Sequence, residues 1–235
     1  MIIGKFVAVI ILGYLLGSIP FGLIISRRQA KVDVRQYGSG KTGATNVLRT
    51  AGKKAAALVA ALDLSKGVLA VVFARLIVSD DYLVIGSFSL GMVIAQVMAA
   101  LAAIVGHIWP VFLKFRGGRG VATFIGGLAA LCPPAAIFSG EVIIISAGLT
   151  RYVSLGSIAG MVSSYAILIP LHIVDRFPIE YLAYALIGTI MVVAMHRDNI
   201  ARLVSGKERK LGDKAQENDS GPPTPQNPRF QGPPS

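Results

Sequence analysis

The feature that most constrains this chain is a series of long apolar windows that contain almost no charge. Stretches of about 20 apolar residues match a hydrocarbon core about 30 Å thick, because a helix rises about 1.5 Å per residue. Hydrophobic residues make up 54% of the 235 residues and charged residues only 15%. This composition is more apolar than that of a typical soluble domain. The sequence therefore predicts an integral membrane protein built from helices.

Apolar windows that are expected to form membrane spans cover residues 2–25, 55–78, 85–105, 121–131, 135–149, 153–173 and 178–195. The first window carries only Lys5 as a basic residue near its start, so we interpret it as a retained helix and not as a signal peptide. The windows 121–131 and 135–149 are separated by Pro133 and Pro134. They form either one kinked span or two short spans joined by a reversal of the chain.

The distribution of Lys and Arg decides between these two topologies. If the chain reverses at Pro133 and Pro134, the inside segments hold 19 of the 23 Lys and Arg residues; these segments are 26–54, 106–120, 150–152 and 196–235. A single span over 121–149 would place the seven basic residues after Met195 outside, against the positive-inside rule. We therefore predict an all-α integral membrane protein with seven transmembrane helices, two of them short around Pro133 and Pro134. Its N-terminus is expected outside and its C-terminus in the cytoplasm. The same bias explains the net charge of +11 without a nucleic-acid partner.

The composition also predicts a domain boundary near the C-terminus. Residues 1–212 are expected to form the membrane domain, and residues 213–235 a disordered cytoplasmic tail. This tail is rich in Pro, Gly, Asn and Gln, with Phe230 as its single aromatic residue, so it cannot bury enough apolar surface to fold alone. Cys132 is the sole cysteine, which excludes an intrachain disulfide and a multi-cysteine metal site. We expect neither a metal nor a cofactor.

Charged residues inside spans are costly in a membrane and usually face other helices. Asp63 and Lys66 are three positions apart, and we expect them to pair and to brace the bundle or to gate it. Glu141 lies in the middle of a predicted span without an evident partner in sequence, and its role stays open. His172 is expected at the membrane face opposite to the basic loops, and is therefore not assigned to the functional site.

The first cytoplasmic loop has the residue types of an anion site. It reads Gly38-Ser-Gly-Lys-Thr-Gly-Ala-Thr-Asn-Val-Leu-Arg49. Glycines allow backbone N–H groups to approach an anion, and a helix that begins there adds the positive end of its dipole. Ser39, Thr45 and Asn46 offer neutral donors, and Arg49 offers a two-pronged donor for phosphate. A flexible loop whose charges only set the topology is the alternative, but the density of polar donors favours the anion site.

Two further stretches are expected on the same membrane face. Gly117, Gly118, Arg119 and Gly120 precede the short span 121–131, which places backbone N–H groups and a helix dipole beside a cation and predicts a second phosphate cradle. After the last span, His196 and Asn199 are three positions apart and share one face of a continuing helix. His196 can act there as an acid, a base or a phosphate ligand.

Together, the stretches GSGKTGATNVLR, GHIWPVFLKFRGGRGVAT and HRDNIARL resemble the motif set of the bacterial acyl-phosphate:glycerol-3-phosphate acyltransferases, the PlsY type. The resemblance extends from the first span through about Leu211. It implies a seven-span enzyme of the bacterial cell membrane with its active site on the cytoplasmic face. The implied reaction moves a fatty acyl group from acyl phosphate to the 1-hydroxyl of glycerol 3-phosphate and yields lysophosphatidic acid and phosphate. The implied partners are these two substrates and membrane lipid, and the oligomeric state stays open.

Carried onto matching positions, the resemblance implies catalytic roles for His196, Asn199, Ser39 and Arg49. It further implies substrate binding by Thr45, Asn46, Gly117, Gly118, Arg119, Gly120 and Ser154. Two positions depart from the family pattern, which typically has lysine at Arg119 and asparagine at Lys41. Arginine keeps the positive charge at position 119 but replaces a compact ammonium with a planar fork, which changes the geometry of a phosphate contact.

The chemistry of the implied reaction agrees with the residues. Both substrates carry phosphate, which explains two separate anion cradles. The chain lacks a convincing Ser-His-Asp set, and acyl phosphate is already an activated donor, so a covalent acyl-enzyme is not required. No histidine is followed at the fifth position by Asp, which argues against the mechanism common among acyl-coenzyme A and acyl-carrier-protein acyltransferases. Positioning and charge stabilisation should supply most of the rate. The proton of the attacking hydroxyl can go to His196 or to a substrate phosphate.

A membrane carrier for a phosphorylated solute or lipid is the alternative function. Broken spans whose helix ends bind anions also occur in carriers. A carrier needs polar residues that are accessible from both faces, whereas the anion-binding residue types here fall almost entirely on the predicted cytoplasmic face. The spans also show no apparent internal repeat. Both features favour the enzyme.

Overall fold

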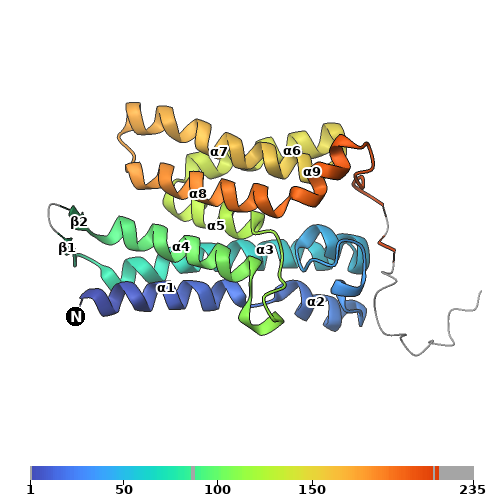
Figure 1. Cartoon of the computed structure of the whole chain (residues 1–235), viewed down its shortest axis with the longest axis horizontal. Coiled ribbons are helices and arrows are strands. Elements are labelled where there is room, and N and C mark those ends of the chain that lie inside the picture. The colour runs from blue at the N-terminus through green and yellow to red at the C-terminus, as the bar shows by residue number, and fades with distance from the viewer. Residues whose placement is uncertain (1, 86–87, 214, 217–235) are drawn as a thin grey trace, which may run out of the picture.

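The computed structural model describes residues 2–85, 88–213 and 215–216, which form a bundle of long helices lying side by side (Figure 1). Its helices are α1 (Ile2–Ser18), α2 (Phe21–Ala30), α3 (Ala44–Val78), α4 (Met92–Ile108), α5 (Val121–Leu131), α6 (Pro133–Thr150), α7 (Val153–Asp175), α8 (Ile179–Met195) and α9 (Arg197–Val204). Two single 3-10 turns, η1 (Val34–Gln36) and η2 (Val111–Leu113), lie in loops. One hairpin consists of β1 (Leu83–Ile85) and β2 (Phe88–Leu90).

The helices coincide in position with the seven predicted spans, but they are not equally suited to cross a membrane. Five stretches of the described chain are long and apolar enough, namely α1 with α2, α3, α4 with η2, α6, and α7. The pair α8 and α9, bent by 61°, is a sixth if it counts as one span. The helix α5 has only 11 residues. Length and apolar character therefore support five or six of the predicted spans.

Three predicted boundaries are wrong. The first span was expected to end at residue 25, but its helix is interrupted between Ser18 and Phe21, and α2 continues to Ala30. The third span was expected to begin at residue 85, but residues 83–85 and 88–90 pair as antiparallel strands with Leu83 opposite Leu90, and α4 begins only at Met92. The apolar run Leu83-Val84-Ile85 and the alternating Phe88-Ser89-Leu90 suit short strands as well as a helix start. The second helix begins at Ala44 instead of residue 55, and it is broken at Gly52, whose φ of 86° interrupts the helical geometry.

Small residues bring α1 and α4 into close contact. Gly13 and Gly17 lie against the backbone of Ala99 and Ala103, and a Cβ at either glycine would collide with the facing carbonyl oxygen. Gly106 of α4 is packed in the same way against α1. Close approach of backbones at small residues is typical of helix pairs in membranes, where lipid offers no hydrophobic drive for association. This contact fixes the end of α4 beside the break between α1 and α2.

The predicted pair of charges in the second span is confirmed. Lys66 Nζ lies 2.9 Å from Asp63 Oδ1, and both side chains are only 3% exposed. Lys66 also donates to the carbonyl of Ile19 at 3.3 Å, in the break that separates α1 from α2. The same carbonyl accepts from the N–H of Phe21 at 3.1 Å, so Lys66 adds a second donor there and ties α3 to this break. Glu141, by contrast, is exposed on α6.

The chain reverses direction between α5 and α6. Gly120 and Val121, before and at the start of α5, line the same cavity as Val153 and Ser154, which follow α6. The chain therefore leaves the cavity along α5 and returns along α6. Proline has no backbone N–H to donate, so Pro133 cannot continue α5. The first turn of a helix does not need this donor, so Pro133 can begin α6. This agrees with the reversal predicted at Pro133 and Pro134.

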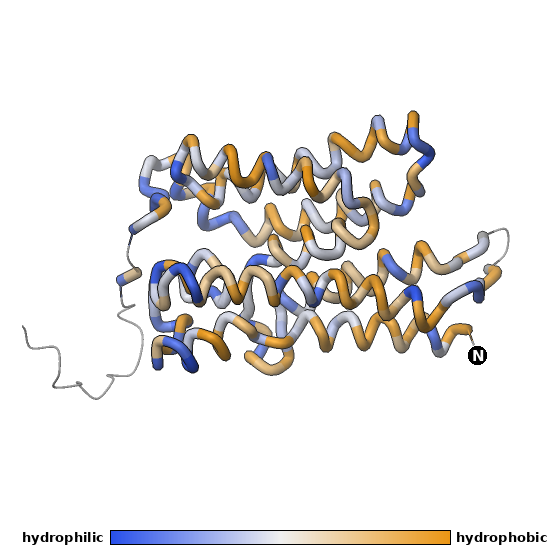
Figure 2. The backbone as a smooth tube through the Cα atoms, turned by 180° about the vertical axis from the view of Figure 1, so that it is seen from behind, coloured by the Kyte–Doolittle hydropathy of each residue, from blue (hydrophilic) through white to orange (hydrophobic). Residues whose placement is uncertain are grey.

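The outer surface of the bundle is apolar along its length, and its polar residues are concentrated at one end. Figure 2 shows that most hydrophilic residues gather at the end formed by α2, η1 and α9, away from the N-terminus. Large apolar side chains are exposed on the outer faces of α1, α3, α6 and α7, including Ile3, Leu76, Ile144, Leu149 and Val174. An apolar exterior of this extent suits lipid and not water. The N-terminus and the last described residues lie at opposite ends of the bundle (Figure 1).

Candidate active site

A cavity of about 470 Å³ lies toward the polar end of the bundle and is lined by the first loop, α3, the end of α4, the start of α5, α6, α7 and α9. Its polar and charged wall consists of Ser39, Lys41, Thr45, Asn46, Arg49, Asp63, His107, Arg119, Ser154, Ser157, His196, Asn199 and Glu208. These residues come from sequence positions more than 160 apart. The structure thus brings all three predicted stretches to one site.

Nine of the eleven residues assigned from the sequence line this cavity: Ser39, Thr45, Asn46, Arg49, Arg119, Gly120, Ser154, His196 and Asn199. Gly117 and Gly118 do not. Their N–H groups donate to the carbonyls of Ile108 and His107, each at 3.1 Å, so both are committed to the backbone of the α4 end. The cradle expected over residues 117–120 therefore narrows to Arg119 and Gly120, whose φ of 89° lets the chain turn into α5.

The amide of Asn46 holds the first loop in shape. Its Nδ2 lies within 3.0 Å of the carbonyls of Val34, Tyr37 and Lys41, and its Oδ1 accepts from the N–H of Ser39 at 3.2 Å. An amide has only two donor hydrogens, so these contacts use its donor capacity. Asn46 therefore shapes the cavity wall, and the structure gives its side chain no free donor for a substrate.

Arg49 joins the first loop to the segment after α9. Its Nη2 donates to the carbonyls of Arg209 at 3.3 Å and of Lys210 at 3.4 Å. The N–H of Ala215 approaches the carbonyl of Arg49 at 3.5 Å, and the N–H of Gly38 donates to Gln216 at 2.9 Å. Residues 215 and 216, which the sequence assigns to the disordered tail, thus contact the first loop. The rest of that tail, 214 and 217–235, lies outside the described residues.

The cationic side chains of the cavity exceed its free carboxylates. Lys41, Arg49 and Arg119 line the wall, whereas Glu208 is bonded to its neighbours and Asp63 to Lys66. Burial and the nearby Arg119 lower the pKa of Lys41, and burial together with Arg202 lowers the pKa of Arg119 to about 10. Arg119 is therefore still charged at neutral pH, and its buried Nε has no hydrogen-bond partner within the described chain. Cations that have no carboxylate partner in the described part of the chain favour an anionic ligand such as phosphate.

Glu208 is a site residue that sequence reasoning missed. It accepts from Asn199 Nδ2 at 2.6 Å, from Ser154 Oγ at 2.9 Å and from Arg202 Nε at 2.7 Å. Burial raises the pKa of this carboxyl, but the bonds from Asn199, Ser154 and Arg202 outweigh burial and hold the pKa below its usual value. Glu208 is therefore ionised and accepts only. It lies in a run of charged residues after α9, where nothing in the sequence distinguishes it from a solvated residue.

His196 and Asn199 present hydrogen-bond acceptors to the cavity. His196 Nδ1 lies 2.7 Å from the carbonyl of Val192, so Nδ1 carries the proton and Nε2 the lone pair. Burial lowers the pKa of His196 to about 4, which keeps the ring neutral at pH 7. Because Nδ2 of Asn199 must donate to Glu208, its Oδ1 is left as an acceptor, and this buried oxygen has no partner among the described residues. Such acceptors suit a hydroxyl group, not a phosphate dianion.

The remaining wall of the cavity is apolar. It is formed by small and branched side chains of α3, α5 and α6, namely Ala60, Ala61, Leu64, Ala122, Ile125, Ile143 and Ile144. Ile144 is also 72% exposed on the outer face of α6, so the apolar part of the cavity reaches the surface that suits lipid. One cavity thus offers cations at one side and a surface for a hydrocarbon chain at the other.

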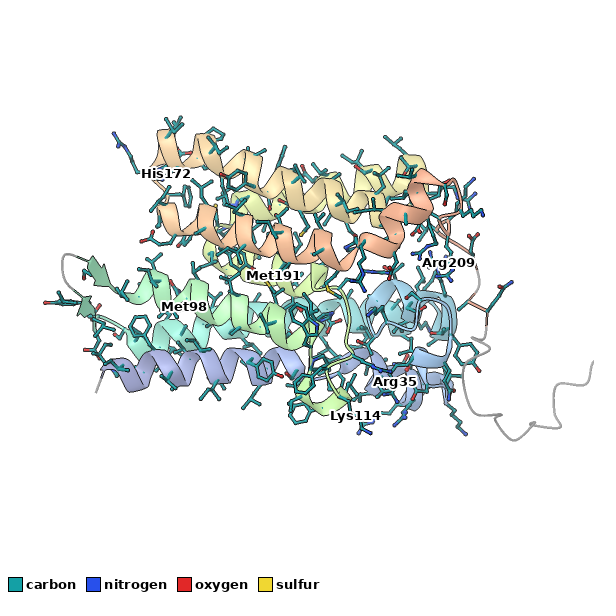
Figure 3. All side chains as sticks on the ribbon, in the orientation of Figure 1. Arg35, Met98, Lys114, His172, Met191 and Arg209 are labelled. Carbon is teal, nitrogen blue, oxygen red and sulfur yellow. The ribbon has the colours of Figure 1, made fainter. Side chains whose placement is uncertain are left out.

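Other features singled out in the sequence lie away from the cavity. His172 is at the far end of the bundle from Arg209, as Figure 3 shows, and its Nδ1 contacts the carbonyl of Phe177 at 2.6 Å. This agrees with its exclusion from the site. Trp109, Phe112 and Phe115 are exposed around η2, on a loop that also carries Lys114. Such a mixture of exposed aromatic and basic residues is typical of the boundary between membrane and water.

Comparisons with known proteins identify the family of this chain. The family model described as Glycerol-3-phosphate acyltransferase matches residues 7–206. A relative from Dehalococcoides mccartyi with the name Glycerol-3-phosphate acyltransferase 3 is 61% identical over 92% of this chain and 100% of its own length. A Glycerol-3-phosphate acyltransferase from Halalkalibacterium halodurans is 44% identical over 86% of this chain and 93% of the relative.

Solved structures show the same arrangement of helices. The crystal structure of PlsY, an integral membrane glycerol 3-phosphate acyltransferase, in its glycerol 3-phosphate form superposes with a TM-score of 0.76 and 36% identity, over 88% of this chain and 96% of that one. Its lysophosphatidic acid form gives a TM-score of 0.73 and 35% identity, over 88% and 95%. With its apolar exterior and several apolar helices, the present chain is a multi-pass membrane protein. It belongs to the glycerol-3-phosphate acyltransferase family.

Proposed function

We propose that this protein transfers a fatty acyl group from acyl phosphate to the 1-hydroxyl of glycerol 3-phosphate, giving lysophosphatidic acid and phosphate for phospholipid synthesis. The observation that carries this proposal is one cavity in which cations without a carboxylate partner among the described residues adjoin an apolar wall that reaches the lipid-facing surface. Acyl phosphate has this same division into an anionic head and a hydrocarbon chain. The related PlsY structures are of glycerol 3-phosphate and lysophosphatidic acid forms, which correspond to the proposed acceptor and product.

The two kinds of polar group in the cavity suit two parts of the substrates. Lys41, Arg49 and Arg119 bind the phosphate groups, and Ser39 and Thr45 add neutral donors beside them. His196 Nε2 and Asn199 Oδ1 accept hydrogen bonds from the glycerol hydroxyls. Glycerol 3-phosphate is therefore held with its phosphate on the cations and its reactive hydroxyl beside His196 and Asn199. Holding both substrates in one geometry supplies much of the rate, because it removes the entropy cost of their encounter.

The reaction then needs no covalent intermediate. The oxygen of the 1-hydroxyl bonds to the acyl carbon, and the bond from that carbon to the phosphate oxygen breaks as phosphate leaves with the electron pair. Arg119 and Lys41 stabilise the charge on the leaving phosphate. His196, whose pKa lies at about 4, is a weaker base than a phosphate group, whose second pKa is about 6. Of the two proton acceptors that the sequence leaves open, the proposal therefore takes the substrate phosphate, with His196 orienting the hydroxyl.

The proposal includes a topology of seven spans with the N-terminus outside and the cavity at the cytoplasmic face. Charge supports this orientation, because the polar end carries η1, α9 and the basic loops around the cavity. The site would then meet soluble glycerol 3-phosphate from the cytoplasm and the acyl chain from the membrane. A carrier gains no support from the cavity, since its polar wall lies at one end of the bundle only.

The direct test uses purified protein in detergent or lipid with acyl phosphate and labelled glycerol 3-phosphate. We expect labelled lysophosphatidic acid and inorganic phosphate in equal amounts. Acyl-coenzyme A replaces acyl phosphate in a parallel reaction, and it is expected to give no product. The proposal is refuted if folded protein forms neither product from acyl phosphate. Product formed only from acyl-coenzyme A would refute acyl phosphate as the donor but would still support glycerol 3-phosphate as the acceptor.

A further inference from the structure

A buried polar cluster at the end of α4 forms part of the cavity wall through Asp63 and His107. His107 Nδ1 lies 3.2 Å from Thr123 Oγ1 on the first turn of α5 and 3.6 Å from Asp63 Oδ1 on α3. Asp63 in turn is paired with Lys66, which donates to Ile19 and lies 5.8 Å from the centre of the Phe21 ring. The cluster thus links α2, α3, α4, α5 and the break between α1 and α2 in one network. The proposed acyl-transfer step uses none of these side chains.

The ring of His107 also supports the loop before α5. A Cβ at Gly118 would collide with His107 Nε2, so the loop backbone lies directly on the edge of the ring. The N–H groups of Gly117 and Gly118 donate to carbonyls of the same α4 turn, which holds this part of the loop without any role for a ligand. Only glycine at position 118 allows this approach.

Arg119 follows this supported position at once and is followed by Gly120, which turns the chain into α5. Its guanidinium therefore projects into the cavity from a backbone that is held by His107 on one side and by the start of α5 on the other. Thr123 contacts the same ring, so His107 touches both segments that flank Arg119. A change in the ring position would move the cation relative to the phosphate that it binds.

From this arrangement we propose that His107 is a positioning residue, which together with the Asp63–Lys66 pair aims Arg119 at a substrate phosphate. The proposal rests on the function proposed above. It assigns no proton transfer to His107. Its consequence is that the shape of the ring against Gly118 determines how tightly a phosphate-bearing substrate binds, while the reacting groups around His196 are unaffected.

The test exploits the fit between His107 and Gly118. Gly118→Ala adds a methyl group that collides with the ring, whereas His107→Asn removes the edge of the ring that faces Gly118 and keeps a polar nitrogen near the position of Nδ1. We expect Gly118→Ala to raise the KM of glycerol 3-phosphate or of acyl phosphate by about tenfold, the worth of one weakened charge-assisted bond, with little change in kcat. In the double variant Gly118→Ala/His107→Asn, this KM should return to that of His107→Asn alone.

A matched control distinguishes positioning from general destabilisation. Gly13→Ala creates a similar collision with the backbone of Ala99 on the α1–α4 contact, away from the cavity. It is expected to lower the melting temperature in detergent without changing the ratio of KM to kcat. If Gly118→Ala does not fold, recovery of folding in the double variant supports the contact between residues 107 and 118. If the double variant does not fold either, the test uses His107→Asn and His107→Gln, at least one of which should raise the KM of a substrate.

The proposal is overturned if Gly118→Ala has the same effect with and without His107→Asn, or if no variant of either residue changes either KM. Wild-type protein is assayed first. Absence of turnover in the wild type would count against the proposed function, whereas normal wild-type turnover with additive variants would count against the role of His107 alone.

Discussion

The bonds of Glu208 make a prediction that depends on the direction of a single amide. Glu208 accepts from Asn199, Ser154 and Arg202, so Asn199 turns its Nδ2 toward the carboxylate and its Oδ1 toward the cavity. Glu208→Gln keeps the size of the side chain but brings an NH₂ group into this network. If the glutamine oxygen stays with Arg202, its NH₂ faces Asn199, whose amide must rotate to offer Oδ1. The cavity then receives a donor in place of an acceptor.

The size of the effect follows from the bonds that change. Loss of the acceptor for a substrate hydroxyl costs about 1–1.5 kcal/mol, and an unsatisfied group left in its place costs up to about 3 kcal/mol. We therefore expect kcat/KM for glycerol 3-phosphate to fall between about fivefold and a hundredfold in Glu208→Gln. Asn199→Asp alone places two carboxylates together and should lower both activity and stability.

The double variant Glu208→Gln/Asn199→Asp restores the pattern. One carboxylate oxygen of the new aspartate accepts from the glutamine, and the other faces the cavity as an acceptor. Its kcat/KM should be at least about tenfold higher than the value expected if the effects of the two single substitutions were independent, which corresponds to a coupling free energy of about 1.4 kcal/mol. Steady-state kinetics of the four proteins at saturating acyl phosphate measure this coupling. Additive single effects would refute the proposed orientation of Asn199.

Three further predictions concern charge. Arg49→Ala should raise the glycerol 3-phosphate concentration needed for half-maximal rate by about one to two powers of ten, since a charge-assisted bond is worth about 1.5–3 kcal/mol, and an unchanged requirement would place Arg49 outside the site. The pKa of His196 is lowered from 6.5 to about 4, so the folded protein should lose on the order of 3 kcal/mol of stability as the pH falls from 6.5 to 4, because the unfolded chain takes up the proton first. Melting curves of wild type and His196→Gln check this; equal pH dependence would contradict it. Asp63→Asn should lower the free energy of unfolding by about 3–5 kcal/mol, because it leaves Lys66 buried without its partner. The double variant Asp63→Asn/Lys66→Met should regain most of this stability. If it does not, loss of the ion pair is not the cause of the destabilisation.

The sequence predicts the helices well where the pattern is long and apolar, and it predicts their ends poorly. The spans after Val121 begin and end close to their expected positions because charges, glycines or prolines mark both ends. The start of α4 was misplaced because residues 83–90 are apolar enough for a span and also suit a hairpin. The start of α3 was misplaced because Gly52 and two lysines interrupt the apolar pattern without ending the helix.

For the site, the sequence identifies residue types in local motifs, but not the partners that come from elsewhere in the chain. Arg49, Arg119 and His196, which line one cavity, could be proposed from the sequence because each lies in a dense polar motif next to a span. Glu208 was missed because its role depends on contacts with α7 and α9 that no local pattern records. Gly118 was assigned to an anion cradle for the same reason, since only the fold shows its N–H on α4.

The most direct test of the proposed substrate site is an experimental structure of the wild-type protein with glycerol 3-phosphate bound. We expect the phosphate in the cavity, with an oxygen at hydrogen-bond distance from at least one of Lys41, Arg49 and Arg119. We also expect a glycerol hydroxyl between His196 Nε2 and Asn199 Oδ1, with Nδ2 of Asn199 still on Glu208. A ligand outside this cavity, or one with its phosphate on the His196–Asn199 pair and its hydroxyls on the cations, would contradict the proposed site.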